Sequence, residues 1–214
     1  MNSLRVLALL ASLPLLLGGW GEKHEGVNVE ELGQRESIWY LKDSETPYSG
    51  KFYALHPNGQ KMGEGNFKDG KEDGLTTSWH KNGQKKFERN FKAGKRDGLY
   101  VEWYPNGKKN QEVNYKDGKY DGLYTSRHEN GQKQFEINYN DGEPNGLEVY
   151  WYKNGQKEVE ANYKDGKPDG LYLEWHENSK KKLEENWRNG KKISKNFWNR
   201  KGESVDSREE AEAE

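Results

Sequence analysis

Apolar and polar residues alternate in short runs, and similar runs return along most of the chain. In the stretch 80–103, Phe87, Arg89 and Phe91 point one way, and the residues between them point the other way. A second run, 99–103, alternates in the same manner. Short alternating runs bounded by Asn-Gly and Asp-Gly are typical of antiparallel strands joined by hairpins. No stretch after position 25 shows a helical period with caps. The sequence therefore predicts an all-β chain with two strands in each repeat.

The repeat is 24 residues long. Its clearest marker is the phrase Asn-Gly-Gln-Lys, which occurs in four intact copies and two degraded ones. The copies begin at Asn58, Asn82, Asn106, Asn130, Asn154 and Asn178. A period of about 20–50 residues indicates an architecture in which each unit buries its apolar surface against its neighbours. We therefore expect an elongated antiparallel β-meander of tandem β-hairpin repeats that forms an open sheet.

The pairing within each hairpin follows from the loop length. A three-residue loop around each Asn-Gly fits the apolar pattern better than a two-residue loop. In that register Thr77 faces Phe87, and Trp79 shares a face with Phe91. The loop glycine, Gly107 for example, is expected to have a positive φ because it takes the bulge position.

Composition tests whether such a chain folds at all. Only 30% of residues are hydrophobic, 33% are charged and the mean hydropathy is −1.33, which is typical of disorder. Aromatic residues, however, make up 13% of the chain and are periodic. They occupy two repeat positions, Trp79, Trp103, Trp151 and Trp175 at one and Phe67, Phe91, Tyr115, Tyr139, Tyr163 and Trp187 at the other. Cross-strand aromatic pairs each contribute about 0.2–1 kcal/mol. We therefore expect a folded sheet of about six repeats over 39–202, with local rather than central burial.

The first residues, 1–21, form a different kind of segment. A basic start is followed by an apolar run at 7–17 and by small residues, which resembles a bacterial secretory signal. Cleavage of a signal peptide after Gly21 and an uncleaved N-terminal anchor both stay open. Trp20 stands where a lipoprotein needs cysteine, and the chain has no cysteine, so neither lipidation nor a disulfide is expected. We expect export to the periplasm, the cell envelope or the medium, with membrane contact only through an uncleaved N-terminal segment.

The segments beside the repeats lack the period. Residues 22–38 are polar and acidic and are interpreted as a linker. Residues 39–55 resemble an irregular first repeat, because Gly50 lies 24 positions before Gly74. Residues 203–214 are interpreted as an acidic disordered tail.

Charge argues against a nucleic-acid partner. The net charge is −1, and the repeat block alone carries about +6. Each lysine is interleaved with glutamate and aspartate, so no continuous basic face is expected.

Four histidines occupy one repeat position: His56, His80, His128 and His176. Successive repeats are two strands apart, so equivalent atoms should lie about 9–10 Å from each other. A single Zn²⁺ needs ligands at about 2.0–2.1 Å, so neighbouring repeats cannot share a metal through this position. We interpret it as an aromatic-sized residue at the end of a strand and expect no metal.

A ladder of glutamates repeats in the same way, at Glu64, Glu88, Glu112, Glu136, Glu160 and Glu184. Equivalent carboxylates give no reason for one to differ in pKa from the next, so ion pairing with cross-strand lysines is expected rather than acid–base chemistry. The stretch 69–74 resembles a calcium loop but lacks its alternating ligands and closing glutamate. No phosphate loop or nucleophile elbow is present. We therefore expect no enzymatic activity and no cofactor.

The phrase Asn-Tyr-Lys-Asp-Gly-Lys-x-Asp-Gly-Leu occurs at 114–123 and 162–171. It resembles the MORN repeat in its bacterial variant, which also appears in proteins named YwqK-family antitoxins of toxin–antitoxin systems. The resemblance covers about 48–192. It implies an elongated sheet of hairpins, a role in protein association and no catalytic residues.

These observations predict a non-enzymatic repeat protein that mediates protein–protein interaction at the bacterial cell envelope. A second hypothesis is binding of a cell-wall glycan, because a row of Trp79, Trp103, Trp151 and Trp175 offers rings that can stack on sugars. Arg127 interrupts that row. A third hypothesis is a YwqK-like antitoxin, which the export segment opposes. The four tryptophans are the candidate partner-binding residues.

Overall fold

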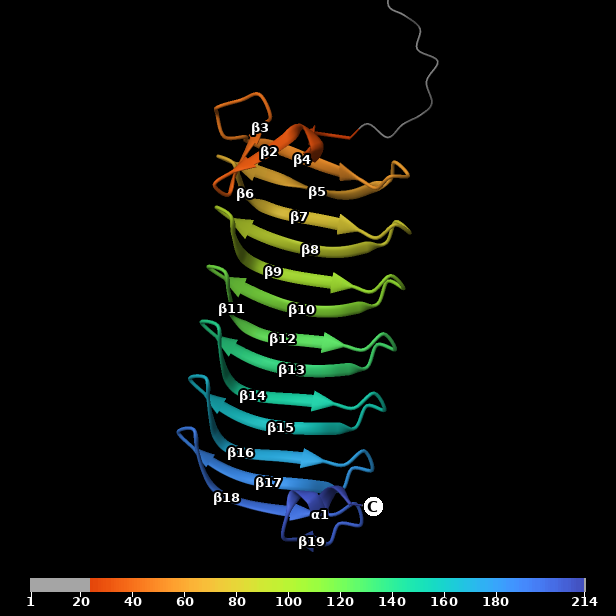
Figure 1. Ribbon diagram of the computed structural model, residues 1–214, viewed down its shortest axis with the longest axis vertical. Coiled ribbons are helices and arrows are strands. Elements are labelled where there is room, and N and C mark those ends of the chain that lie inside the picture. The colour runs from red at the N-terminus through yellow and green to blue at the C-terminus, as the bar shows by residue number, and fades with distance from the viewer. Residues whose placement is uncertain (1–23, 214) are drawn as a thin grey trace, which may run out of the picture.

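The computed structural model describes residues 24–213, and the segment to which the signal-peptide prediction applies lies outside them. The chain forms a long, open sheet of consecutive antiparallel hairpins (Figure 1). The predicted all-β meander is therefore confirmed. Within the described residues, no helix combines the length and the apolar character needed to cross a membrane.

The strands of the long sheet are β1 (Val27–Asn28), β4 (Gly50–Leu55), β5 (Lys61–Lys68), β6 (Lys71–Glu72), β7 (Gly74–Trp79), β8 (Lys85–Lys92), β9 (Lys95–Trp103), β10 (Lys109–Lys116), β11 (Lys119–Tyr120), β12 (Gly122–Arg127), β13 (Lys133–Asn140), β14 (Glu143–Trp151), β15 (Lys157–Lys164), β16 (Lys167–Trp175), β17 (Lys181–Arg188), β18 (Lys191–Trp198) and β19 (Ser204–Val205). Two further strands, β2 (Leu32–Arg35) and β3 (Ile38–Leu41), pair with each other. The helices are the 3-10 helix η1 (Val29–Glu31) and α1 (Arg208–Glu212).

Two kinds of turn alternate along the sheet. At one end of the strands, tight two-residue turns join pairs such as β10 and β11, where Asp117 has φ 51° and Gly118 has φ 88°. Two successive positive φ angles define a type I′ turn, whose twist matches that of the strands. The Asn-Gly loops lie at the other end of the strands. In one of them the His80 N–H donates to the Gln84 carbonyl oxygen (2.8 Å) and the Gly83 N–H donates to the His80 carbonyl oxygen (2.9 Å). The predicted three-residue loop is present.

Gly107 has φ +80°, as expected from the sequence, and this leads to a stability prediction. A left-handed conformation costs a non-glycine residue about 1–2 kcal/mol. A Cβ added to Gly107 would also lie 2.7 Å from the Gln84 Oε1 atom. We expect Gly107→Val to lower the free energy of unfolding by about 1–2 kcal/mol in urea titration. The exposed neighbouring change Lys108→Ala is expected to stay within about 0.5 kcal/mol. Equal midpoints for the two variants would contradict the hairpin geometry.

The predicted register holds only next to the loop. Trp79 pairs with Lys85 as that register requires, but Ser78 then pairs with Phe87, and Thr77 pairs with Glu88. Lys86 is the extra residue of a β-bulge, and one inserted residue turns every later side chain of that strand to the other face. The prediction that Thr77 faces Phe87 and that Trp79 shares a face with Phe91 is therefore wrong. The register shifts next to the other Asn-Gly loops as well.

The bulges give the sheet two different faces. We call one the tyrosine face. Tyr100 and Val113 pair across β9 and β10 and therefore lie on this face, and the register of β10 with β12 puts Tyr124 on it as well. The other is the tryptophan face, which carries Trp79 and Val101. Val113 is 2% exposed and Val101 is 5% exposed, so both faces bury small residues between larger neighbours. Burial is local and spread along the sheet, as the composition predicts.

Residues 24–38, the described part of the segment predicted to be a linker, instead contribute to an N-terminal cap. Leu32 is buried against Phe52 and Phe67, with Trp39 packed beside them. β1 pairs in parallel with β4, and the Trp39 N–H donates to the Gly70 carbonyl oxygen (2.9 Å). β3 belongs to this cap, so the interpretation of 39–55 as an irregular first repeat holds only for its second strand, β4.

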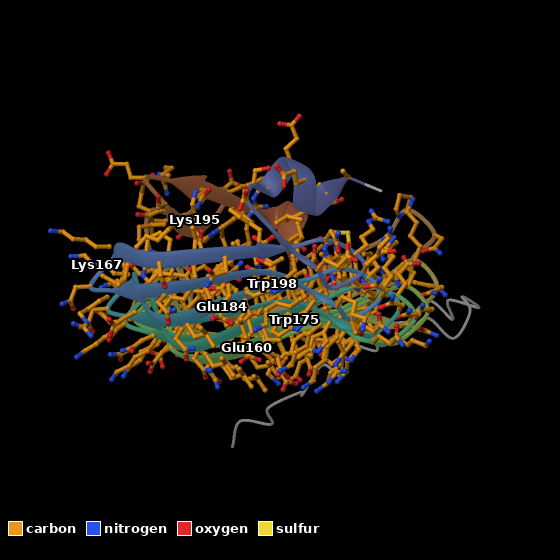
Figure 2. All side chains as sticks on the ribbon, turned by 90° about the horizontal axis from the view of Figure 1, so that it is seen from below. Glu160, Lys167, Trp175, Glu184, Lys195 and Trp198 are labelled. Carbon is orange, nitrogen blue, oxygen red and sulfur yellow. The ribbon has the colours of Figure 1, made fainter. Side chains whose placement is uncertain are left out.

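The predicted disordered tail, 203–214, also differs from the structure. β19 pairs with β18, and α1 places Ala211, which is fully buried, against Leu183 and Phe197. Figure 2 looks along the sheet and shows α1 and the first strands on the same side of it. Both caps therefore cover the tyrosine face, one at each end.

Ion pairs at the C-terminal cap predict a pH dependence. Arg208 pairs with Glu174 (2.9 Å), and Lys182 pairs with Glu212 (2.9 Å). Burial opposes ionisation of Glu174, but hydrogen bonds from Arg208 and Tyr172 outweigh it, so the pKa of Glu174 lies below its ordinary value. A depressed folded pKa contributes stability above the unfolded pKa, about 4.3, and that stability is lost as pH falls through the folded value.

We therefore expect α1 to exchange its amide hydrogens faster below about pH 4 than at about pH 6, after correction for intrinsic exchange rates. Glu174→Gln removes the titrating group and should flatten this dependence. Identical pH profiles for the two proteins would contradict the role of Glu174.

Candidate functional site

The four candidate tryptophans lie in one row on the tryptophan face, near the Asn-Gly loops. They are half-buried, and none belongs to the buried core. A lysine from the preceding hairpin lies over each ring, with ammonium-to-centroid distances of 5.4, 5.8, 5.2 and 5.8 Å. The pairs are Lys61 with Trp79, Lys85 with Trp103, Lys133 with Trp151 and Lys157 with Trp175. Each ring thus has a cation over one of its faces.

The same lysines form ion pairs with the glutamate ladder. Lys61 pairs with Glu64 (2.8 Å) and Lys133 with Glu136 (2.7 Å), each three positions apart in one strand. The predicted ion pairing of this ladder is therefore present, but the lysines lie in the same strand rather than across from the glutamates. Because these groups are partly exposed, each pair contributes about 0–1 kcal/mol.

Sequence reasoning missed one member of the tryptophan row. Trp198 receives Lys181 over its ring at 4.9 Å, although it lies 23 rather than 24 positions after Trp175. Figure 2 labels Trp175, Glu184 and Trp198, which lie together in this view, whereas Lys195 lies on the side of α1. The one-residue change of period is the reason why a strict 24-residue spacing does not find this tryptophan.

Side chains at the histidine position contact the backbone of the next repeat. His56 and His80 place their Nε2 atoms 3.1 and 2.9 Å from the carbonyl oxygens of Trp79 and Trp103. Tyr152, in the same position, donates its hydroxyl to the Trp175 carbonyl oxygen (2.7 Å). The interpretation as an aromatic-sized residue at a strand end therefore agrees with these contacts. Among residues 24–213, no three His, Asp or Glu side chains gather as a metal would require.

Five leucines form a second row on the tryptophan face. They are Leu75, Leu99, Leu123, Leu147 and Leu171, and they are 51, 42, 45, 42 and 37% exposed. Asparagines alternate with them, and the Asn90 side chain donates to the Leu99 carbonyl oxygen (2.9 Å). The row is regular, but each leucine is separated from the next by a polar side chain.

The tyrosine face carries a continuous strip of aromatic rings that sequence reasoning found only in part. The column that includes Tyr115 and Tyr139 was recognised as periodic. Tyr100 and Tyr124 occupy a second repeat position, and Tyr150 lies opposite Phe135 in the neighbouring strand. Neighbouring rings along the strip have centroids 4.9–6.4 Å apart. The strip consists of Tyr100, Tyr115, Tyr120, Tyr124, Phe135, Tyr139 and Tyr150. We use the name aromatic strip for these seven residues below.

Carboxylates accompany the rings. The Tyr100 hydroxyl donates to Glu102 (2.9 Å), and the Gln111 side chain donates to the same carboxylate. Burial, followed by the hydrogen bond to Glu102, raises the pKa of Tyr100 to about 12. Burial, followed by the nearby carboxylate of Glu148, likewise raises the pKa of Tyr150. These tyrosines therefore stay neutral and keep hydroxyl donors beside the carboxylates at physiological pH.

Comparison with known families agrees with this geometry. The profile of the family described as MORN repeat variant matches four successive segments, at 72–93, 96–117, 120–141 and 144–165. No curated protein matches the chain significantly, and the resemblance to YwqK-family antitoxins is not confirmed. The four segments coincide with successive hairpins of the sheet, from β6 to β15. Residues 72–165 of this chain are therefore four tandem MORN repeat variants.

Proposed function

We propose that this chain is a non-enzymatic scaffold that binds a partner protein at the bacterial cell envelope. MORN repeats are generally interaction or binding repeats, and proteins built from them are typically non-enzymatic. The observation that carries the proposal is the aromatic strip, which none of residues 24–213 covers between the two caps. At both ends of the same face, segments of the chain itself are packed by polypeptide contacts, Leu32 and Trp39 at one end and Ala211 at the other.

The envelope location rests on the sequence of residues 1–21. A basic start, an apolar run and small residues predict export, and Trp20 excludes the lipid anchor that a cysteine would carry. Fractionation of cells that produce the full chain with a C-terminal tag tests this part. Recovery of the whole pool in the cytoplasm would overturn the envelope assignment and favour the antitoxin hypothesis.

Cell-wall glycan binding is the alternative function. It would use Trp79, Trp103, Trp151 and Trp175 as stacking platforms. The lysines that lie over these rings argue against it, because an ammonium occupies a position that a sugar would need. The interruption at Arg127, which binds the Gly131 carbonyl oxygen (3.3 Å), argues against it as well.

Site-directed photo-crosslinking tests the partner-binding surface. A photoreactive phenylalanine analogue at Tyr139 would lie in the aromatic strip, and the same analogue at Leu147 would lie on the tryptophan face. We expect protein adducts in intact cells from position 139 and none from position 147. Absence of adducts from position 139 would contradict the proposal. Adducts from position 147 alone would indicate that the partner binds at the leucine row instead.

A further inference from the structure

The aromatic strip differs from the rest of the tyrosine face in its charge. Strands β10 to β15 contain seven lysines and arginines, and the strand registers assign all of them to the tryptophan face. They are Lys109, Lys116, Lys119, Arg127, Lys133, Lys157 and Lys164. On the tyrosine face, Glu148 lies in β14, and Glu102 lies in the adjoining strand β9, at the other side of the strip. Within residues 24–213, neither carboxylate has a salt bridge.

The tyrosine face has two arginines near the strip, one over its N-terminal end and one beyond its C-terminal end. At the N-terminal end of the strip itself, the guanidinium of Arg96 lies over Tyr100 and Tyr115, at 5.3 and 5.1 Å, and donates to the Tyr115 hydroxyl (2.6 Å), but it has no salt bridge to Glu102. On the C-terminal side, Arg208 of α1 pairs with Glu174, which also accepts a hydrogen bond from the Tyr172 hydroxyl (3.0 Å).

The Tyr172–Glu174 arrangement recurs at the strip. Tyr100 and Glu102 lie three repeats earlier and have the same hydroxyl-to-carboxylate hydrogen bond. At the C-terminal cap an arginine from a docked segment completes the group, whereas Glu102 has no such partner among the described residues. A guanidinium fits this combination because it pairs with a carboxylate and stacks on an aromatic ring at the same time.

We propose that the aromatic strip binds an extended segment of the partner protein through two arginines, one at Glu102 and one at Glu148, with the tyrosine rings packed against the chain between them. This inference rests on the proposed function and specifies its partner. It also extends an interface that the molecule already uses, because α1 docks on the next part of the same face.

The spacing of the two carboxylates limits the segment. Glu102 lies on β9 and Glu148 on β14, which are four strand steps apart in the sheet. At about 4.8 Å for each step, the distance along the sheet is about 19 Å. An extended chain advances about 3.3 Å per residue, so the two arginines should lie about six residues apart.

Calorimetry with the full chain and a synthetic peptide tests the proposal. The probe is an extended, proline-containing peptide with two arginines about six residues apart, and a matched peptide carries citrulline, a neutral analogue of the same shape. The protein variant is the double substitution E102Q/E148Q, in which the glutamine at position 102 can still accept the Tyr100 hydroxyl. The control is E112Q/E160Q, which removes two charges from the tryptophan face. Thermal melts verify that both variants are folded.

We expect the arginine peptide to bind the wild-type chain and the control equally. Citrulline, or the variant E102Q/E148Q, should weaken binding about tenfold. Undetectable binding of the arginine peptide, or equal loss in both double variants, would overturn the inference. Binding of soluble cell-wall glycan fragments that E102Q/E148Q abolishes would replace it with the glycan class. Crosslinking at position 139 tests the scaffold function separately. If position 139 gives protein adducts but the arginine peptide does not bind, the scaffold function is supported and the partner is recognised by a different chemistry.

Discussion

Replacing Leu183 by alanine is expected to lower the free energy of unfolding by about 2–4 kcal/mol. Leu183 is 1% exposed and lies between Phe197 and Ala211, where β17, β18 and α1 meet. Removing its branched end leaves a cavity within this buried cluster. The effect is large because this cap, like the one at the N-terminal end, concentrates buried apolar contacts that the middle of the thin sheet does not have.

The matched control is Leu171→Ala, in the preceding strand but on the tryptophan face. Leu171 is 37% exposed, so its replacement should cost less than about 1 kcal/mol. Repeats are stabilised mainly by their neighbours, so the loss at Leu183 should appear as faster hydrogen exchange in β17, β18 and α1, with β8 and β9 unchanged. A uniform increase along the whole sheet, or equal effects of the two substitutions, would show that the cap does not behave as a local unit.

The array itself was predictable because each of its features recurs. A single Asn-Gly or Asp-Gly is weak evidence for a hairpin, but the same signals at a fixed spacing specify both turns and the number of strands. Positive φ at Gly107 and the tight turn at Asp117 follow directly, since glycine and aspartate are among the residues that tolerate this conformation.

The register could not be obtained in the same way. The predicted register depended on the face to which Trp79 was assigned. That assignment assumed that one face of the sheet is apolar and the other polar. In this sheet both faces are mixed: Trp79 lies with Glu88 and Lys85, and the rings of Phe87 and Phe91 lie on the other side. A bulge at Lys86 resolves the pattern, and nothing in the composition of that position indicates it.

The caps were missed for a different reason. Leu32, Trp39, Val205 and Ala211 are isolated apolar residues in polar, aperiodic segments, and such segments are typical of linkers and tails. They pack in the structure because the end repeats offer complementary apolar surfaces. These surfaces contain Phe52 and Phe67 at the N-terminal end and Leu183 and Phe197 at the C-terminal end. That complementarity exists only in the folded sheet, so sequence reasoning has no signal for it. The aromatic strip was predicted only in part, because Tyr120 and Tyr150 have no aromatic equivalent 24 residues before or after them.

The N-terminal cap leads to the second large expected effect, which concerns Gly70. This glycine has φ +73° in a tight turn, its carbonyl oxygen accepts the Trp39 N–H (2.9 Å), and its own N–H donates to the Tyr48 carbonyl oxygen (2.8 Å). A Cβ added here would lie 2.3 Å from Ile38 Cγ2 and 2.8 Å from the Trp39 carbonyl oxygen. Gly70→Ala should therefore combine left-handed strain with a steric clash and lower the free energy of unfolding by about 3–4 kcal/mol.

Gly118 supplies the control, because it occupies the same turn position two repeats later, with φ +88° and no atom within 4 Å of an added Cβ. Gly118→Ala should carry the backbone strain alone, about 1–2 kcal/mol. The difference between the two variants, measured by urea unfolding, then isolates the contact between the cap and the sheet. Gly70→Ala should also increase hydrogen exchange at Trp39 and in β2 and β3, whereas Gly118→Ala should not. Equal stabilities would mean that residues 32–41 do not dock on this turn in solution, and the tyrosine face would then be open at its N-terminal end.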